Sequence, residues 1–241
     1  MTNGNRNSLQ YVRGKSLVIP DLFGYAQMEE FGGALSFSSS RTIHKALEYG
    51  SWPNLDTTVA EALSLEQCTI DWALPAETEN CMAEALFTMV GAALLAHPRS
   101  FGLVSTEIPI SALATTTAAV RSGKRMIEMY AGLGVSWDRV IFRAPASYEG
   151  LRATAALTLA GLKVHVTHIY SLEQAVLAKE AGAFAGQVYI DRVNGACQDG
   201  VHLAREVHKV FKAGTAGRLG GTALIVASLS SLSDVADVAG A

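Results

Sequence analysis

Short β-prone runs alternate with helix-prone stretches along most of the chain, and this alternation limits the possible folds more than any other feature. The β-prone runs lie at 16–21, 33–39, 69–75, 102–108, 139–145, 163–169, 185–191 and 222–228. The helix-prone stretches lie at 40–49, 77–96, 115–134, 147–162, 171–183 and 198–213. Such alternation with short links is typical of parallel sheets. We therefore predict an α/β fold, a (β/α)8 TIM-type barrel in preference to a doubly wound sheet, as a single domain over 15–241 after a flexible tail over 1–14.

Polar residues mark the starts of two of these helices. Ser147 is a candidate N-cap, and Glu149 follows it in the first helical turn, where a carboxylate is favourable. Ser171 and Gln174 have the spacing of a capping box, and Gly182 marks the end of that helix.

Composition argues against several classes of function. The formal net charge is −3, so we expect neither nucleic acid nor an anionic membrane as a partner. Cys68, Cys81 and Cys197 are scattered without metal-binding spacing, and no G-x-G-x-x-G or Walker loop is present, so we expect no metal and no cofactor. The apolar run at 85–96 is too short to cross a bilayer. The polar N-terminus has no secretory signal, which predicts a cytoplasmic protein.

In a barrel of this kind the chemistry lies at the carboxyl ends of the strands. Asp21 and Glu107 end two of the β-prone runs, Arg143 ends "VIF", and Arg192 follows "VYID". An obligate cation such as Arg143 is unexpected where a strand meets its loop.

The strand pleat adds further candidates to this end of the barrel. It sends His165 and Thr167 to one face of the 163–169 run and Val164, Val166 and His168 to the other. Because valines suit the helix-facing side, we expect His165 and Thr167 to face the barrel axis. The same alternation places Gln187 and Tyr189 together on one face of the 185–191 run.

Four segments then resemble the signature blocks of the transaldolase family: "LVSTEI", "SWDRVIFRAPASYEGLRA", "GLKVHVTHIYSLEQAVLAKEAGA" and "YIDRV". "VIPD" and "SFSSSRTIHKAL" resemble its first two strand ends more weakly. The resemblance implies a (β/α) barrel, in agreement with the alternation.

The resemblance also implies that Arg143 stands where transaldolases carry the lysine that forms a Schiff base with the sugar. A guanidinium stays protonated and cannot form an imine. No other lysine is a convincing substitute, because Lys15 and Lys163 lie at strand starts. The remaining lysines fall in helix-prone stretches: Lys45, Lys124, Lys179, Lys209 and Lys212.

The remaining implied site residues divide into two groups. Those that match the family are Asp21, the acid/base Glu107, the water-holding Thr167 and the phosphate-binding Arg192. Those that depart from it are Ser39 and His165 in place of asparagines, Gln187 in place of a phosphate-site serine, Ser230 in place of a second phosphate arginine, and Tyr189 at an aromatic position. The resemblance thus implies that only half of the family's phosphate-binding site is retained, and that the substrate is not phosphorylated.

By family order the eighth barrel strand is absent. An open barrel would expose a strand edge. We expect the chain to form a homo-oligomer, specifically a dimer, whose second copy covers this edge. Two alternatives are that helix 231–240 covers the edge, or that the sequence comes from a shortened gene model.

Three functional hypotheses follow. The first is an enzyme, with a role in specialised metabolism, that acts on a small carbonyl metabolite by general acid/base catalysis. Arg143 would bind a carbonyl or carboxylate there, while Glu107 or His165 would move the proton. The second is a catalytically inactive homologue that serves as a binding or scaffold subunit. For Arg143 and Glu107 themselves, the structural alternative to a catalytic role is an ion pair between them. The third is an active transaldolase or aldolase with a relocated lysine.

Overall fold

The computed structural model describes residues 11–12, 14–19, 35–48, 55–64, 75–97, 100, 102–213 and 221–240. Within them, six parallel strands form one sheet in chain order. They are β1 (Leu35–Ser38), β2 (Leu103–Glu107), β3 (Val140–Pro145), β4 (Lys163–Ile169), β5 (Ala185–Tyr189) and β6 (Ala223–Ala227). A doubly wound sheet would reverse its strand order at a switch point. The unbroken order is that of a barrel, and the predicted fold class is confirmed as a half-barrel.

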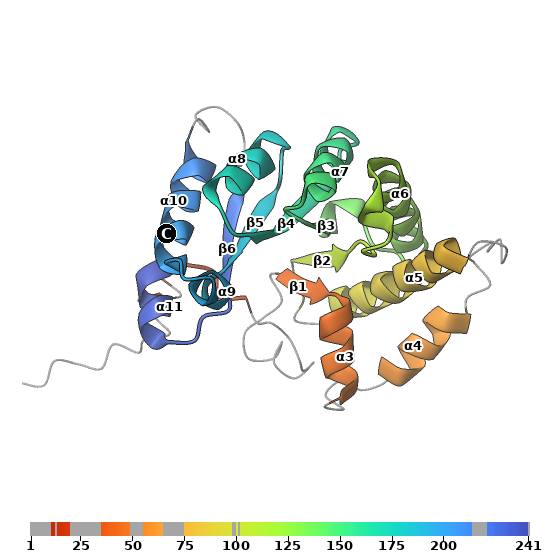
Figure 1. The fold of residues 1–241 in the computed structure, drawn as a ribbon. Helices are drawn as coiled ribbons and strands as arrows, with labels where there is room; N and C mark the ends of the chain where they lie inside the picture. The colour runs from red at the N-terminus through yellow and green to blue at the C-terminus, as the bar shows by residue number, and fades with distance from the viewer. Residues whose placement is uncertain are drawn as a thin grey trace, which may run out of the picture.

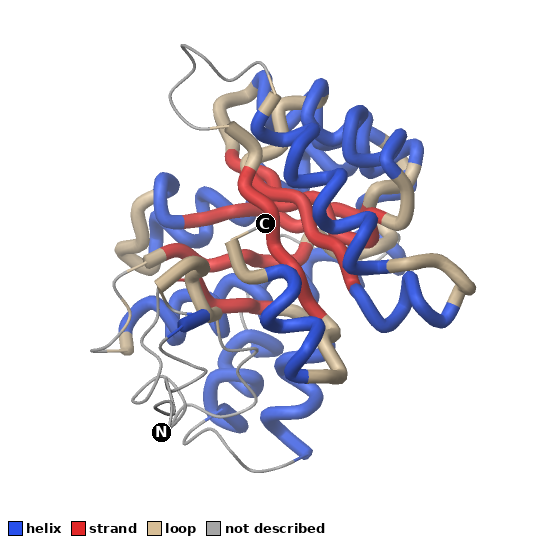
Figure 2. The backbone as a smooth tube through the Cα atoms, turned by 90° about the vertical axis from the view of Figure 1, so that its left-hand side faces the viewer, coloured by secondary structure: helices blue, strands red, loops and turns tan. Residues whose placement is uncertain are grey.

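Helices follow the strands and cover the outside of the sheet. They are α3 (Ser40–Glu48), α4 (Leu55–Ser64), α5 (Pro75–Ala96), α6 (Thr116–Gly132), α7 (Tyr148–Leu159), α8 (Leu172–Glu180), α9 (Ile190–Gly195), α10 (Gly200–Lys212) and α11 (Leu232–Val238). Single 3₁₀ turns occupy Ala112–Ala114 and Trp137–Arg139. The helices from α5 to α10 surround the sheet in an arc (Figure 1), and the strands gather in the middle of the molecule (Figure 2).

The two faces of the sheet bury different side chains. Toward the helices, alternate strand residues join the large core: Val104, Val140, Phe142, Val164, Val166 and Val188. On the other face, Leu35, Phe37 and Ile141 form a smaller apolar cluster. The predicted direction of Val164 and Val166 is therefore confirmed, and His165 and Thr167 lie on the inner face.

The predicted cap residues form the expected bonds. The Ser147 hydroxyl accepts a hydrogen bond from the Gly150 backbone N–H at 3.1 Å. The Ser171–Gln174 capping box opens α8, and Gly182 follows that helix with a φ of 79°. Both helix starts were thus correctly predicted from local polar residues alone.

Several predicted boundaries are wrong. Residues 16–19 lie in a bend and irregular chain rather than a strand, and the rest of that run, with Asp21, lies outside the described residues. Of the run at 69–75, only Pro75 is described, and it begins α5. Asp191 lies in α9 rather than in a strand. The helix α4 was not predicted.

Among the described residues, α5 has one window, Glu79–Ala96, long and apolar enough to cross a membrane, with 44% of it buried in the protein. Phe87, Val90 and Leu94 of this helix belong to the core. Its position against the sheet is that of a core helix.

Candidate functional site

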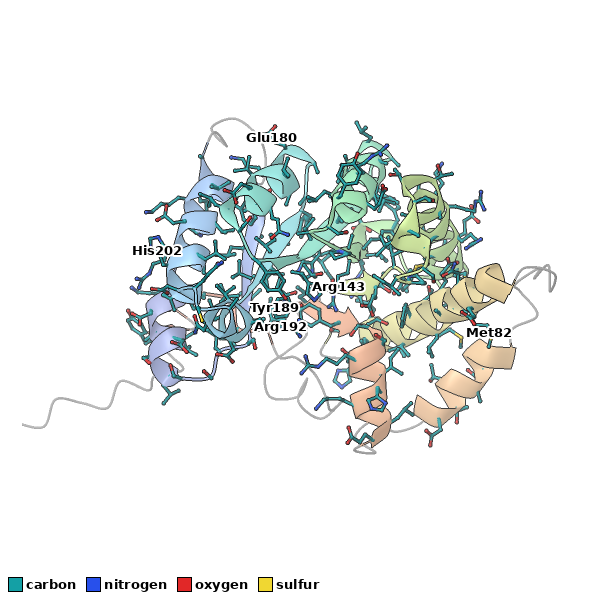
Figure 3. The ribbon with its side chains drawn as sticks, viewed as in Figure 1. Met82, Arg143, Glu180, Tyr189, Arg192 and His202 are labelled. Atoms are coloured by element: carbon teal, nitrogen blue, oxygen red, sulfur yellow. The ribbon has the colours of Figure 1, made fainter. Side chains whose placement is uncertain are left out.

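Three of the predicted site residues lie side by side across the sheet. Glu107 of β2 pairs in register with Arg143 of β3, which pairs with His165 of β4. Neighbouring strands lie about 4.8 Å apart, so these side chains project from neighbouring strands at the same height in the sheet. Arg143, Tyr189 and Arg192 all appear toward the middle of the view in Figure 3, while Glu180 and His202 lie on the outer helices. The candidate site is this group at the carboxyl ends of the strands.

Glu107 is half-buried and is joined to the start of α3. Its Oε2 accepts hydrogen bonds from the Ser40 backbone N–H at 2.9 Å and from the Ser40 hydroxyl at 3.1 Å. Ser39 is buried beside it and accepts a 3.3 Å bond from the Thr42 backbone N–H. A carboxylate is stabilised at a helix N-terminus. Glu107 and Ser39 therefore both help to begin α3, a structural role that the sequence did not suggest.

Arg143 lies over an aromatic ring on the inner face. Its guanidinium carbon is 4.8 Å from the centre of the Phe37 ring. In such a cation–π contact the negative face of the aromatic ring attracts the cation, and the contact holds the planar guanidinium in one orientation. Phe37 was not among the predicted site residues, although it occupies an inward position of β1.

His165 is completely buried, and its surroundings favour the neutral imidazole. Its Nδ1 lies 3.0 Å from the Ser105 hydroxyl. Burial lowers the pKa of His165 well below 6.5, and the positive charge of Arg143 lowers it further. Gln187 opposes this lowering, but within the described residues no group meets the geometry of a hydrogen bond to Nε2. His165 can therefore accept a proton only at a large energetic cost.

Thr167 and His168 lie where β4 departs from regular geometry. The register with β5 shifts between Val166 and Ile169, and His168 has a left-handed backbone with a φ of 60°. The Thr167 oxygen lies 2.8 Å from His168 Nδ1. The His168 ring is 5.2 Å from the Tyr189 ring, so the predicted helix-facing side for His168 is wrong. The irregularity turns the imidazole toward the site.

Tyr189, Gln187 and Arg192 complete the group. The Tyr189 hydroxyl donates to Gln187 Oε1 at 3.3 Å. Arg192 starts from α9, is exposed, and places its guanidinium carbon 4.5 Å from the centre of the Tyr189 ring. A cation, a phenol and an imidazole thus lie next to one another in sequence from Arg192 through Tyr189 to His168.

The structure does not unite all the predicted residues. Ser230 is exposed between β6 and α11, and within the described chain no hydrogen bond links it to the other candidates. Asp21 lies outside the described residues. Sequence reasoning missed Ser105, Phe37 and His168. Ser105 and Phe37 could have been found by the inward alternation of their strands, whereas His168 required knowledge of the bulge.

Comparison with other proteins identifies the family. The profile described as Transaldolase/Fructose-6-phosphate aldolase matches residues 41–241. A transaldolase of Methylomonas aminofaciens is 32% identical over 111 residues, which are 46% of this chain and 34% of the relative. A transaldolase of Stutzerimonas stutzeri is 35% identical over 92 residues, or 38% of this chain and 30% of the relative. The matched segment thus spans about a third of each of these curated relatives. The chain belongs to the transaldolase and fructose-6-phosphate aldolase family.

Proposed function

We propose that this family member is an enzyme that works without an imine, with Arg143 at the position of the Schiff-base lysine. Its substrate is a small, non-phosphorylated carbonyl metabolite, and its reaction is C–C bond formation, cyclisation, dehydration or isomerisation. The observation that supports this most strongly is Arg143 in register between Glu107 and His165 at the mouth of the half-barrel.

The positions of the lysines support this proposal, since all seven fall within the described residues. Lys163 begins β4, two residues before His165, but its Nζ donates to the Asp138 carbonyl, which precedes β3. Lys179 of α8 donates to the Val210 carbonyl at 2.7 Å. The other five lie on helices or before β1: Lys15, Lys45, Lys124, Lys209 and Lys212. None lies at the carboxyl end of a strand.

The chemistry follows from the charges of the group. A guanidinium can hold a carboxylate in a two-point grip or stabilise the oxyanion that forms as a carbonyl is enolised. Glu107 or an imidazole can take the proton from the adjacent carbon. Arg192 offers a second cation for a carboxylate at the outer edge of the site.

An imine-trapping experiment tests the position of Arg143. The purified chain is incubated with dihydroxyacetone and borohydride, and peptides are examined by mass spectrometry. The wild type is expected to form no adduct, while Arg143→Lys gains one at position 143; Arg192→Lys is the matched control. A wild-type adduct on any lysine would favour the active aldolase with a relocated lysine. An Arg143→Lys variant without an adduct would contradict the assigned position.

A catalytically inactive scaffold is the second candidate, favoured by the bonds from Ser40 to Glu107. The variant Glu107→Gln separates the two functions, because the amide oxygen can still accept both bonds but cannot take up a proton. Metabolites are compared in source cells that carry the intact gene, a deletion, or the deletion with Glu107→Gln. If a product disappears and Glu107→Gln does not restore it, the enzyme is supported. Full restoration supports the scaffold.

A further inference from the structure

His168 has a backbone conformation that side chains other than glycine rarely adopt. Its φ is 60°, and it lies in the irregular segment of β4 between Val166 and Ile169. Non-glycine residues in this region cluster at functional sites, where the surrounding structure holds them in place. The geometry of β4 is thus altered at His168, the second imidazole that this strand contributes to the site.

The altered backbone brings His168 among the charged groups of the site. Its ring lies 5.2 Å from that of Tyr189 and 6.1 Å from that of Tyr170. Arg192, Arg143 and Glu107 all act on its charge. The imidazole therefore lies beside the Tyr189 ring of β5 and within electrostatic range of charges on β2, β3 and α9, and it is half-buried rather than enclosed like His165.

Two contacts of Thr167 bear on the tautomer of this ring. The Thr167 hydroxyl lies 3.4 Å from the Ala144 carbonyl oxygen and 2.8 Å from His168 Nδ1. When the hydroxyl donates to the carbonyl, which can only accept, the Thr167 oxygen accepts from Nδ1–H. That arrangement leaves the lone pair on Nε2 and is the tautomer that the proposal below uses.

On the basis of the proposed function, we propose that His168 is the catalytic base of this site. Its Nε2 takes a proton from the carbon next to a carbonyl whose oxygen faces Arg143. The C–H bond breaks, its electron pair moves into the enolate, and the negative charge develops on the oxygen. The proton stays on Nε2 until it returns to carbon, so the step needs no oxidant or reductant.

The surroundings of His168 suit a base at neutral pH. Burial lowers the pKa of His168, and the charges of Arg192 and Arg143 lower it further, while Glu107 raises it. The ring is thus uncharged near pH 7 and able to accept a proton. His165 is less suited to this role, because it is completely buried and its pKa is lowered further.

Deuterium exchange tests this role. The full chain is incubated with hydroxyacetone in D₂O, and loss of the α-proton signal is followed by NMR. We expect His168→Asn to slow exchange by at least about 100-fold, which is typical for loss of a general base. Asparagine tolerates the left-handed backbone better than most residues, so this variant is expected to fold. His202→Asn, at an exposed position of α10, is the matched control.

The outcomes distinguish this inference from the proposed function. If the wild type and His168→Asn catalyse deuterium exchange into hydroxyacetone equally fast, His168 is not the base and the proposed function stands. If the wild type does not exchange, the proposed function fails, and the role of His168 in it fails too. Nitrogen-15 NMR of the imidazole needs no substrate and is expected to show Nδ1–H in the wild type and a mixture in Thr167→Val. A proton fixed on Nε2 would overturn the inference by itself.

Discussion

Glu84 and Arg125 show how much a single residue can contribute to the stability of this fold. Glu84 lies on α5 with its side chain 1% exposed, and Arg125 lies on α6 with 34% exposed. Arg125 Nε donates to Glu84 Oε2 at 2.8 Å, and its terminal nitrogen donates to Oε1 at 2.7 Å. This two-point contact satisfies a carboxylate that has almost no access to water.

We predict that Arg125→Met lowers the free energy of unfolding by about 3 kcal/mol, because it leaves a buried carboxylate unpaired. Arg205→Met is the control, since Arg205 and Asp237 form an exposed pair at 3.4 Å, which is expected to contribute less than about 1 kcal/mol. Urea unfolding measures both. Equal midpoints for the two variants would contradict the prediction.

His165 predicts how stability varies with pH. Its pKa in the folded protein lies well below 6.5, so below pH 6.5 the unfolded chain binds a proton that the folded chain does not. Unfolding free energy should therefore be highest above pH 6.5 and fall with decreasing pH, by up to about 1.4 kcal/mol per unit. His165→Gln should reduce this slope between pH 6.5 and 5. His168 contributes in the same direction, so some slope remains; an unchanged slope would show that His165 is protonated in the fold.

At the scale of elements, α5 and α6 approach closely where Gly91 meets Tyr130. A Cβ on Gly91 would lie 2.0 Å from the Tyr130 hydroxyl oxygen, and Tyr130 is completely buried. Glycine is therefore required by the packing, although it weakens the helix that contains it.

Gly91→Ala is predicted to destabilise the protein by about 1–3 kcal/mol through overpacking. Gly132→Ala is the control, because nothing lies within 4 Å of a Cβ at the end of α6. Adding Tyr130→Phe to Gly91→Ala removes the clashing oxygen and should recover part of the loss. Thermal unfolding of the two single variants and the double variant gives a double-mutant cycle for this contact. A Gly91→Ala variant as stable as the Gly132→Ala control would refute the close contact.

The elements also show what the sequence can predict. The start of α8 follows from Ser171 and Gln174 because a capping box depends on residues only three apart. The orientation of His168 depends on a register shift against β5, which strict alternation cannot foresee. Likewise, the bonds between Ser40 and Glu107 join residues 67 positions apart. Local patterns thus predicted most elements and the inward face of the sheet, whereas long-range contacts decided the details of the site.

At the scale of the whole molecule, the β6 edge of the sheet is more exposed than the centre of the sheet. Residues of β3 and β4 are mostly buried, whereas those of β6 are exposed or half-buried. Whether a second copy covers an edge stays a prediction, as does the expected dimer.

Hydrogen–deuterium exchange is expected to show slower exchange in 140–145 and 163–169 than in 223–227, because backbone bonds of a half-exposed strand open more readily. Mass spectrometry at low and high protein concentration measures this. Equal protection at both concentrations and in all three segments would contradict the prediction. Protection of 223–227 that increases with concentration would support the dimer.

The bonds between Ser40 and Glu107 have one more consequence. They tie the position of a carboxylate at the mouth to the first turn of a peripheral helix. When Glu107 turns toward a bound molecule, α3 loses its anionic anchor. The start of α3 should then loosen in step with events in the site, so that the amide of Ser40 serves as a built-in reporter of occupancy.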